Sequence, residues 1–117
     1  MTDAITIFHN PACGTSRNTL AAIREAGHEP KVVEYLKTGW TKPQLKPLLK
    51  DMGAKARDIL RVRGTPAEEL GLTDPKTTDE AILDAMVAHP ILVERPIVVT
   101  PKGTKLCRPS ETVQQLL

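Results

Sequence analysis

The chain has 117 residues and a formal net charge of +2, from 16 Lys and Arg residues against 14 Asp and Glu residues. This length fits a single domain, and a hydrophobic share of 40% supplies one core, which excludes a disordered chain. No apolar run reaches the roughly 20 residues of a membrane span, and the N-terminal MTDAITIF lacks the pattern of a signal peptide. We therefore expect a cytoplasmic protein that does not bind membranes.

Residue usage also argues against two classes of partner. The charges are scattered rather than gathered in a basic tract, and Phe8, Tyr35 and Trp40 are the only aromatic residues, so nucleic-acid binding is not expected. Two cysteines and three histidines, none at the usual ligand spacings, predict no metal site. In the cytoplasm, the distant Cys13 and Cys107 stay reduced.

Three predicted elements open the chain. Residues 4–8 (AITIF) are short, apolar and β-branched and predict a strand, which the HNP sequence at 9–11 ends. A helix follows from position 15 or 16 to about Gly27, and residues 31–36 (KVVEYL) predict a second strand. A crossover helix places the two strands parallel, so the three elements form a βαβ unit.

A predicted helical insertion follows over residues 41–89, where the only periodicities are helical and glycine and proline breakers separate them. Within it, Pro47 lacks a backbone N–H, so we expect its helix to start late or to kink. The clearest helix is expected from Thr78 to Ala88, with Thr78 as the N-cap and no capping box.

Strand character returns after the insertion. Residues 96–100 and 104–107 flank a Pro/Gly turn and predict a hairpin, and Pro109 or Ser110 can start a last short helix. The expected fold is a single α/β domain over residues 1–117, with a mixed sheet and the order β-α-β, helices, β-β-α.

The segment HNPACGTSR at 9–17 carries the candidate chemistry. Cys13 follows a strand and opens a helix, where free N–H groups and the helix dipole lower the pKa of a thiol. We therefore expect Cys13 to be a reactive thiolate, with further stabilisation from His9 and Arg17. The same helix N-terminus is an anion site. Gly14 has no side chain, so an anion can approach the backbone there closely. The residues expected to bind substrate there are Asn10, Gly14, Thr15, Ser16 and Arg17.

The position of the second cysteine indicates the type of redox chemistry. Ser16 stands three residues after Cys13, so the chain has no C-x-x-C motif and no local dithiol. Cys107 lies in a strand-like run and is expected to be a core residue. If so, another molecule must supply the second thiol, and glutathione is the obvious candidate.

Three arginines are candidate ligands of a tetrahedral oxyanion: Arg61, Arg95 and Arg108. Arginine donates two hydrogen bonds at a fixed geometry and keeps its charge. Arg95 and Arg108 flank the predicted hairpin, so they can project together from one edge. Arg57 and Arg63 are expected to be solvated surface residues.

Five motifs extend this interpretation over nearly the whole chain: HNPACGTSRNT at 9–19, DMG at 51–53, HPIL at 89–92, RPIVVTP at 95–101 and LCRPSE at 106–111. Through them the sequence resembles the glutathione- and glutaredoxin-coupled bacterial arsenate reductases. The resemblance implies a thioredoxin-like fold with a helical insertion and a cis proline at Pro96. A proline directly before a predicted strand is itself a reason to suspect a cis bond.

The resemblance also implies roles for individual residues. Cys13 would be the nucleophile that forms a covalent thioarsenate intermediate, and His9 would assist its ionisation. The oxyanion would be bound by Arg61, Arg95 and Arg108. Arsenate would be the substrate, glutathione the co-substrate and glutaredoxin the protein partner, with no bound cofactor and no metal.

The sequence departs from the family in two places. The best-known plasmid-type members have a C-terminal tail beyond the position of Leu117, and Pro47 lies in a helix that is regular in the family. Two alternative functions stay open: a transcriptional regulator similar to Spx, and a reductase of another oxyanion. The regulators generally lack the H-N-P-x-C-G-T-S-R loop and the C-R-P-S arginine that this chain has, whereas phosphate could occupy the same donors.

Overall fold

The structure is a computed structural model that describes residues 5–117, so Ala4 of the predicted first strand lies outside the described residues. The chain divides into two compact units. The first holds the chain up to Thr38 and again from Arg95 to Leu117, and the second is the insertion from Gly39 to Glu94. The insertion unit therefore extends slightly beyond the predicted 41–89.

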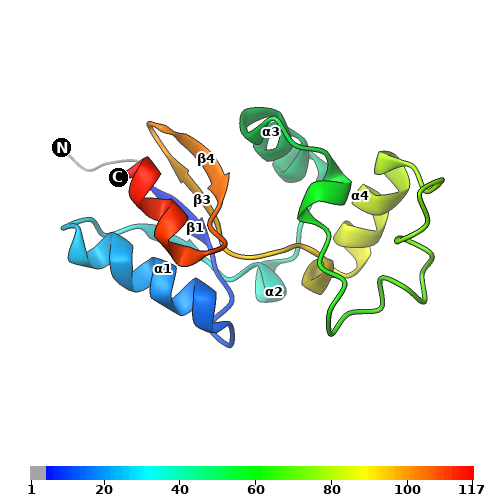
Figure 1. Ribbon diagram of the computed structural model, residues 1–117, viewed down its shortest axis with the longest axis horizontal. Coiled ribbons are helices and arrows are strands. Elements are labelled where there is room, and N and C mark those ends of the chain that lie inside the picture. The colour runs from blue at the N-terminus through cyan, green and yellow to red at the C-terminus, as the bar shows by residue number, and fades with distance from the viewer. Residues whose placement is uncertain (1–4) are drawn as a thin grey trace. The chain divides into compact units, whose positions relative to one another are not determined.

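The first unit is built on a four-stranded mixed sheet with strand order β2-β1-β3-β4 (Figure 1). The strands are β1 (Thr6–Phe8), β2 (Lys31–Val33), β3 (Ile97–Thr100) and β4 (Gly103–Leu106), and helix α1 (Gly14–Glu25) connects the first two. Strand β1 pairs parallel with β2 and antiparallel with β3. The predicted βαβ unit and hairpin are both confirmed, and the fold is thioredoxin-like with a helical insertion.

Apolar side chains from the sheet, α1 and the last helix form the core of this unit. Ile7 and Val98 on neighbouring strands are fully buried and pack against Ile23 of α1. The final segment is a 3-10 helix, η3 (Ser110–Leu116), which adds the buried Val113 to the same cluster. This packing fixes α1 on the sheet, so the N-terminus of α1 has a defined place after β1.

The prediction that the second strand runs to residue 36 is wrong. Strand β2 ends at Val33, whose carbonyl accepts the hydrogen bond of the His9 N–H at 2.8 Å. Because β1 ends at Phe8, no further residues are available to pair with β2. The chain turns instead into the short helix α2 (Tyr35–Thr38), in which the Glu34 carbonyl accepts the first hydrogen bonds.

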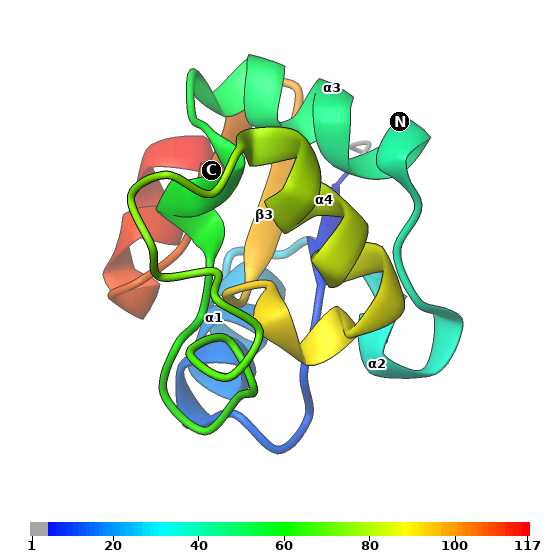
Figure 2. The same ribbon diagram turned by 90° about the vertical axis from the view of Figure 1, so that its right-hand side faces the viewer.

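The insertion unit consists of short helices (Figures 1 and 2): α3 (Lys42–Met52), the 3-10 helix η1 (Ala56–Ile59), α4 (Asp79–Ala88) and the 3-10 helix η2 (Pro90–Leu92). Thr78 caps α4 by accepting from the Ala81 N–H at 3.2 Å, as predicted.

The expectation that Pro47 delays the start of helix α3 is wrong, whereas the alternative expectation of a kink stays a prediction. The helix begins at Lys42 and continues past Pro47, and a capping box between Thr41 and Gln44 fixes its N-terminus. Pro47 has no N–H to donate to the carbonyl of Pro43, and its ring crowds the same carbonyl. Both prolines are exposed, so water can satisfy that carbonyl, and the cost of the proline is smaller than in a buried helix.

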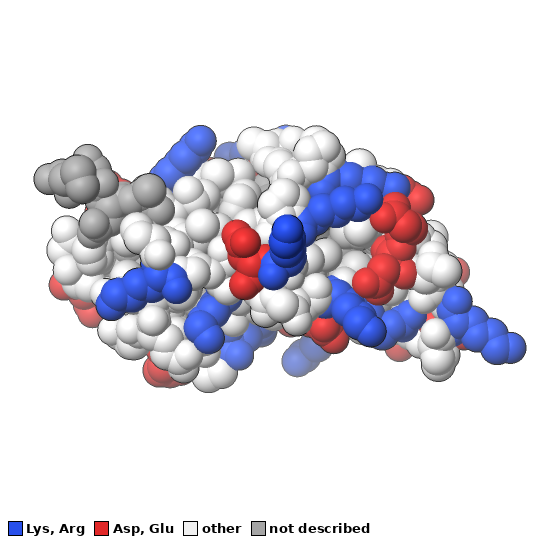
Figure 3. Space-filling model, turned by 90° about the horizontal axis from the view of Figure 1, so that it is seen from above, with Lys and Arg blue, Asp and Glu red and all other residues white. Residues whose placement is uncertain are grey.

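On the face drawn in Figure 3, basic and acidic side chains are interspersed, in agreement with the scattered charges of the sequence. No helix among residues 5–117 is long and apolar enough to cross a membrane. The same described part of the chain contains no cluster of three or more His, Cys, Asp and Glu side chains that could hold a metal ion.

Candidate active site at the N-terminus of helix α1

The loop between β1 and α1 is held by its own hydrogen bonds. The Asn10 side chain accepts from the Ala12 N–H at 2.9 Å, and the Asn10 carbonyl accepts from the Cys13 N–H at 3.0 Å. Cys13 has an extended backbone and is the N-cap of α1, and no acidic residue stands in the first helical turn. The thiol therefore lies at the positive end of a 12-residue helix without a competing carboxylate in that turn.

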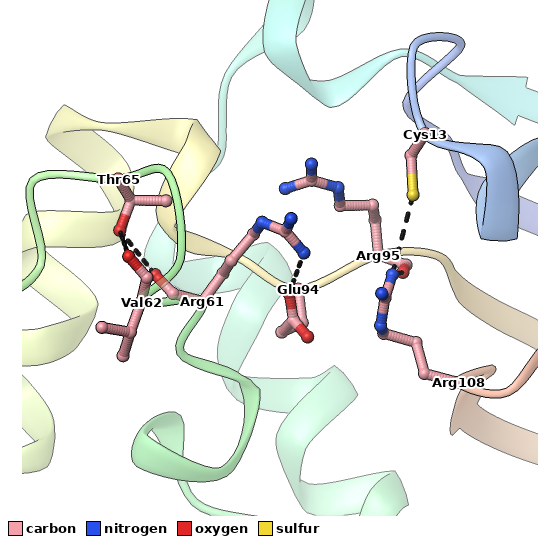
Figure 4. Close-up of polar contacts among 7 residues, drawn as sticks. All are labelled: Cys13, Arg61, Val62, Thr65, Glu94, Arg95 and Arg108. Carbon is pink, nitrogen blue, oxygen red and sulfur yellow. Dashed lines mark hydrogen bonds and ion pairs between the residues drawn. The ribbon is translucent and has the colours of Figure 1, made fainter.

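Cys13 is half-buried and its pKa is lowered to about 7. Burial by itself raises the pKa of this thiol, but hydrogen bonds from the Ser16 backbone N–H and from the Arg108 and Arg95 side chains outweigh burial. The Nη1 atom of Arg108 lies 3.6 Å from the Cys13 sulfur (Figure 4). Cys13 is therefore substantially ionised at neutral pH, and the thiolate is the nucleophilic form of cysteine.

The two arginines reach the thiol because the hairpin returns the chain to its starting point. Arg95 precedes β3 and Arg108 follows β4, and Arg108 Nη1 also donates to the Arg95 carbonyl at 2.8 Å (Figure 4). The two are thus brought together, as predicted from their places in the sequence. Both precede a proline in cis: Pro96, which the sequence suggested, and Pro109, which it did not.

The Arg95 side chain is the feature of the site that most clearly calls for a ligand. The residue is only 9% exposed, and its Nε and Nη1 atoms are buried without a hydrogen-bond partner among residues 5–117. An unsatisfied buried donor costs about 1–3 kcal/mol, and more when it is charged. An anion beside Cys13 would satisfy these donors, and the planar fork of arginine suits a tetrahedral oxyanion.

His9 and Ser16 contact each other. The Nδ1 atom of His9 lies 2.6 Å from the Ser16 hydroxyl oxygen, and both residues are buried. His9 is not among the groups that most strongly lower the pKa of Cys13. The Ser16 backbone contributes to the lowered pKa of Cys13, while the Ser16 hydroxyl is engaged with His9 and with the Asn10 N–H.

The remaining residues of the predicted site differ in what they contact. Arg17 donates to the Pro11 carbonyl at 3.0 Å and so braces the loop. Asn10 is buried and holds the loop through Ala12, whereas Thr15 is half-buried. A Cβ atom at Gly14 would meet Arg17 only at an ordinary 3.7 Å, so the fold itself does not require glycine at this position.

Arg61 belongs to the insertion unit, where its Nη1 donates to Glu94 at 2.9 Å (Figure 4). Its role in oxyanion binding stays a prediction. The expectation for Arg57 is wrong: its side chain donates to three backbone carbonyls, at 3.4 Å to Leu72, 3.2 Å to Asp74 and 2.6 Å to Thr77. No local pattern predicts this role, because the acceptors lie 15 to 20 residues away.

Cys107 is fully buried in the core of the first unit, as expected. Burial raises the pKa of its thiol to about 12, so it is protonated and unreactive at neutral pH. Of the two cysteines, only Cys13 combines solvent access with a lowered pKa.

The model of the ArsC family matches residues 8–116, which is nearly the whole chain. The chain belongs to the ArsC family. It is 58% identical over 113 residues to an arsenate reductase of Rhizobium meliloti, covering 97% of this chain and 81% of the relative. An arsenate reductase of Escherichia coli K12 is 57% identical over the same length, with 97% and 80% covered.

A solved structure supports the assignment of this ArsC-family chain. An arsenate reductase from Vibrio cholerae superimposes with a TM-score of 0.94 at 37% sequence identity, covering all of both chains. The match includes the sheet, α1 and the insertion, so the segments that carry Cys13, Arg95 and Arg108 are part of a shared architecture.

Proposed function

We propose that this chain is an arsenate reductase, in which the Cys13 thiolate reduces arsenate to arsenite with electrons from glutathione and glutaredoxin. The observation that carries the proposal is the buried Arg95 guanidinium, which has unsatisfied donors beside a thiol with a pKa of about 7. A nucleophile and an anion site thus coincide at one helix N-terminus. Because the similar proteins are arsenate reductases, we take arsenate as the anion.

The chemistry follows from the groups present. The Cys13 thiolate attacks arsenic and displaces one oxygen, which leaves as water after protonation, and the Arg95 and Arg108 side chains neutralise the charge on the remaining oxygens. A glutathione thiolate then resolves the adduct. Two electrons pass to arsenic, arsenite leaves, and a disulfide between Cys13 and glutathione remains for glutaredoxin to reduce. In sum, one arsenate and two thiols give one arsenite, one disulfide and one water.

An external reductant is needed because Cys107 cannot act as the second thiol. It is buried, its pKa is raised to about 12, and it packs in the core of the first unit. Glutathione in the cytoplasm supplies the missing thiol, and we place the reaction in that compartment. Arg61 remains in the proposal as a third oxyanion ligand on the strength of the sequence resemblance.

Arsenate-dependent consumption of NADPH tests the proposal, with glutathione, glutathione reductase and glutaredoxin present. Turnover should require glutathione and Cys13, so Cys13→Ser should be inactive, while Cys107→Ala should keep most of the activity. Arg95→Ala and Arg108→Ala should raise the KM for arsenate well above that of Arg63→Ala, an exposed arginine of the insertion unit. Absence of turnover in the wild type, with Cys13 reactive, would overturn the proposal in favour of a regulator or another oxyanion.

A further inference from the structure

Two segments of the insertion unit pair through their backbones next to Arg61. Leu60 and Val93 form an isolated antiparallel bridge. Beside it, the Arg61 N–H donates to the Leu92 carbonyl at 2.7 Å. In this register Arg61 and Glu94 are diagonal neighbours, and because side chains alternate between the two faces of a strand, both lie on the same face. The pairing therefore places the guanidinium and the carboxylate within reach of each other.

The ion pair between Arg61 and Glu94 is largely shielded from solvent. Arg61 Nη1 donates to Glu94 Oε1 at 2.9 Å, and the two side chains are 20% and 21% exposed. The side chains of the ion pairs that join α3 to α4 in the same unit are 35% to 65% exposed. Water and salt screen a partly buried pair less than an exposed one, so this contact restrains the arginine more than a surface pair would.

The backbone of Arg61 is fixed on both sides, whereas its guanidinium keeps donors for a ligand. The Arg61 carbonyl accepts from the Thr65 hydroxyl at 2.7 Å (Figure 4), and its N–H is bound to Leu92. Among residues 5–117, the guanidinium has no hydrogen bond besides the one from Nη1 to Glu94. The Nε and Nη2 hydrogens of Arg61 can therefore be donated to an anion.

We propose that Glu94 is a positioning residue for Arg61. Its carboxylate holds the guanidinium in one orientation through Nη1 and leaves the other donors available to a tetrahedral oxyanion. An arginine that is already ordered loses less side-chain freedom when a ligand binds, so less affinity is spent on ordering it. The inference rests on the proposed function for the role of Arg61 as an oxyanion ligand, and it adds the group that orients this ligand.

The negative charge of Glu94 gives the proposal an opposite alternative. If the carboxylate acted mainly by neutralising Arg61, its removal would strengthen the binding of an anion. If it orients Arg61, its removal weakens binding, because the anion must then order a free side chain. Glutamine separates the two effects, since its side-chain oxygen keeps the hydrogen-bond acceptor and its amide carries no charge.

Calorimetric titration of arsenate into the Cys13→Ser protein measures binding without turnover. In this background, Glu94→Ala should raise the Kd about two- to tenfold, whereas Glu94→Gln should keep the affinity of the parent. Glu80→Ala is the matched control, because it removes exposed ion pairs of the same unit, and it should leave the Kd unchanged. Urea titrations establish that each variant is folded.

A double-mutant cycle shows whether Glu94 acts through Arg61. Arg61→Ala alone should weaken binding, and the addition of Glu94→Ala should weaken it no further. Unchanged or tighter binding by folded Glu94→Ala protein, or equal weakening with and without Arg61, would overturn the inference. Absence of turnover in the wild type, with this coupling intact, would overturn the proposed function alone.

Discussion

Replacing Arg108 by glutamine should make Cys13 less reactive at neutral pH. With a pKa of about 7, the thiol is half ionised at pH 7, whereas an ordinary cysteine is about 3% ionised there. After offsetting the effect of burial, the groups around the sulfur therefore leave a net gain of about 15-fold in thiolate at that pH. An equal share among the Ser16, Arg108 and Arg95 donors is about 2.5-fold each, so Arg108→Gln should slow alkylation at pH 7 about two- to fivefold.

The assay is the rate of iodoacetamide alkylation between pH 5 and 10, together with thiolate absorbance at 240 nm. The rate should approach the wild-type value above pH 9, where the thiol ionises without help, and Arg63→Gln should follow the wild-type profile throughout. Circular dichroism and thermal unfolding establish that the variant is folded, since Arg108 also donates to the Arg95 carbonyl. A folded Arg108→Gln protein with the wild-type pH profile would show that the arginine does not set the pKa of Cys13.

Three further outcomes are expected. Gly14→Ala should leave the free energy of unfolding unchanged or raise it by up to about 1 kcal/mol, yet it should raise the KM for arsenate severalfold. An unchanged KM would mean that no anion approaches the backbone at this position. Arg57→Ala should lower the free energy of unfolding by about 1–3 kcal/mol, because three carbonyls lose a donor, while Cys13 alkylates at the normal rate; equal stability in urea titrations would contradict this. The pKa of Cys13 is about 7 in the folded chain and about 8.5 when unfolded, so the unfolded state binds more protons between these values. The free energy of unfolding of the wild type, minus that of Cys13→Ala, should therefore rise from pH 7 to 8.5, and this gain should be lost below pH 7. A difference that does not change with pH would refute the lowered pKa.

Local patterns in the sequence were sufficient for the elements that depend on near neighbours. The β-branched run before His9 predicted a strand, the change to helical spacing predicted α1, and Thr78 predicted the start of α4. Such patterns did not predict that β2 stops at Val33, because its end depends on where β1 runs out of residues to pair. The continuous helix through Pro47 depended on a capping box and on exposure, which a rule about proline alone does not include.

The sequence by itself determined that Cys13 stands at a helix N-terminus, since strand, loop and helix are consecutive and their order places the thiol. Only the tertiary structure decided which groups set its reactivity. Arg108 lies 95 residues from Cys13 in the chain and meets it because the hairpin returns to the loop. Likewise, a shared motif cannot show that His9 contacts Ser16, because hydrogen bonds depend on directions in space that spacing along the chain does not specify.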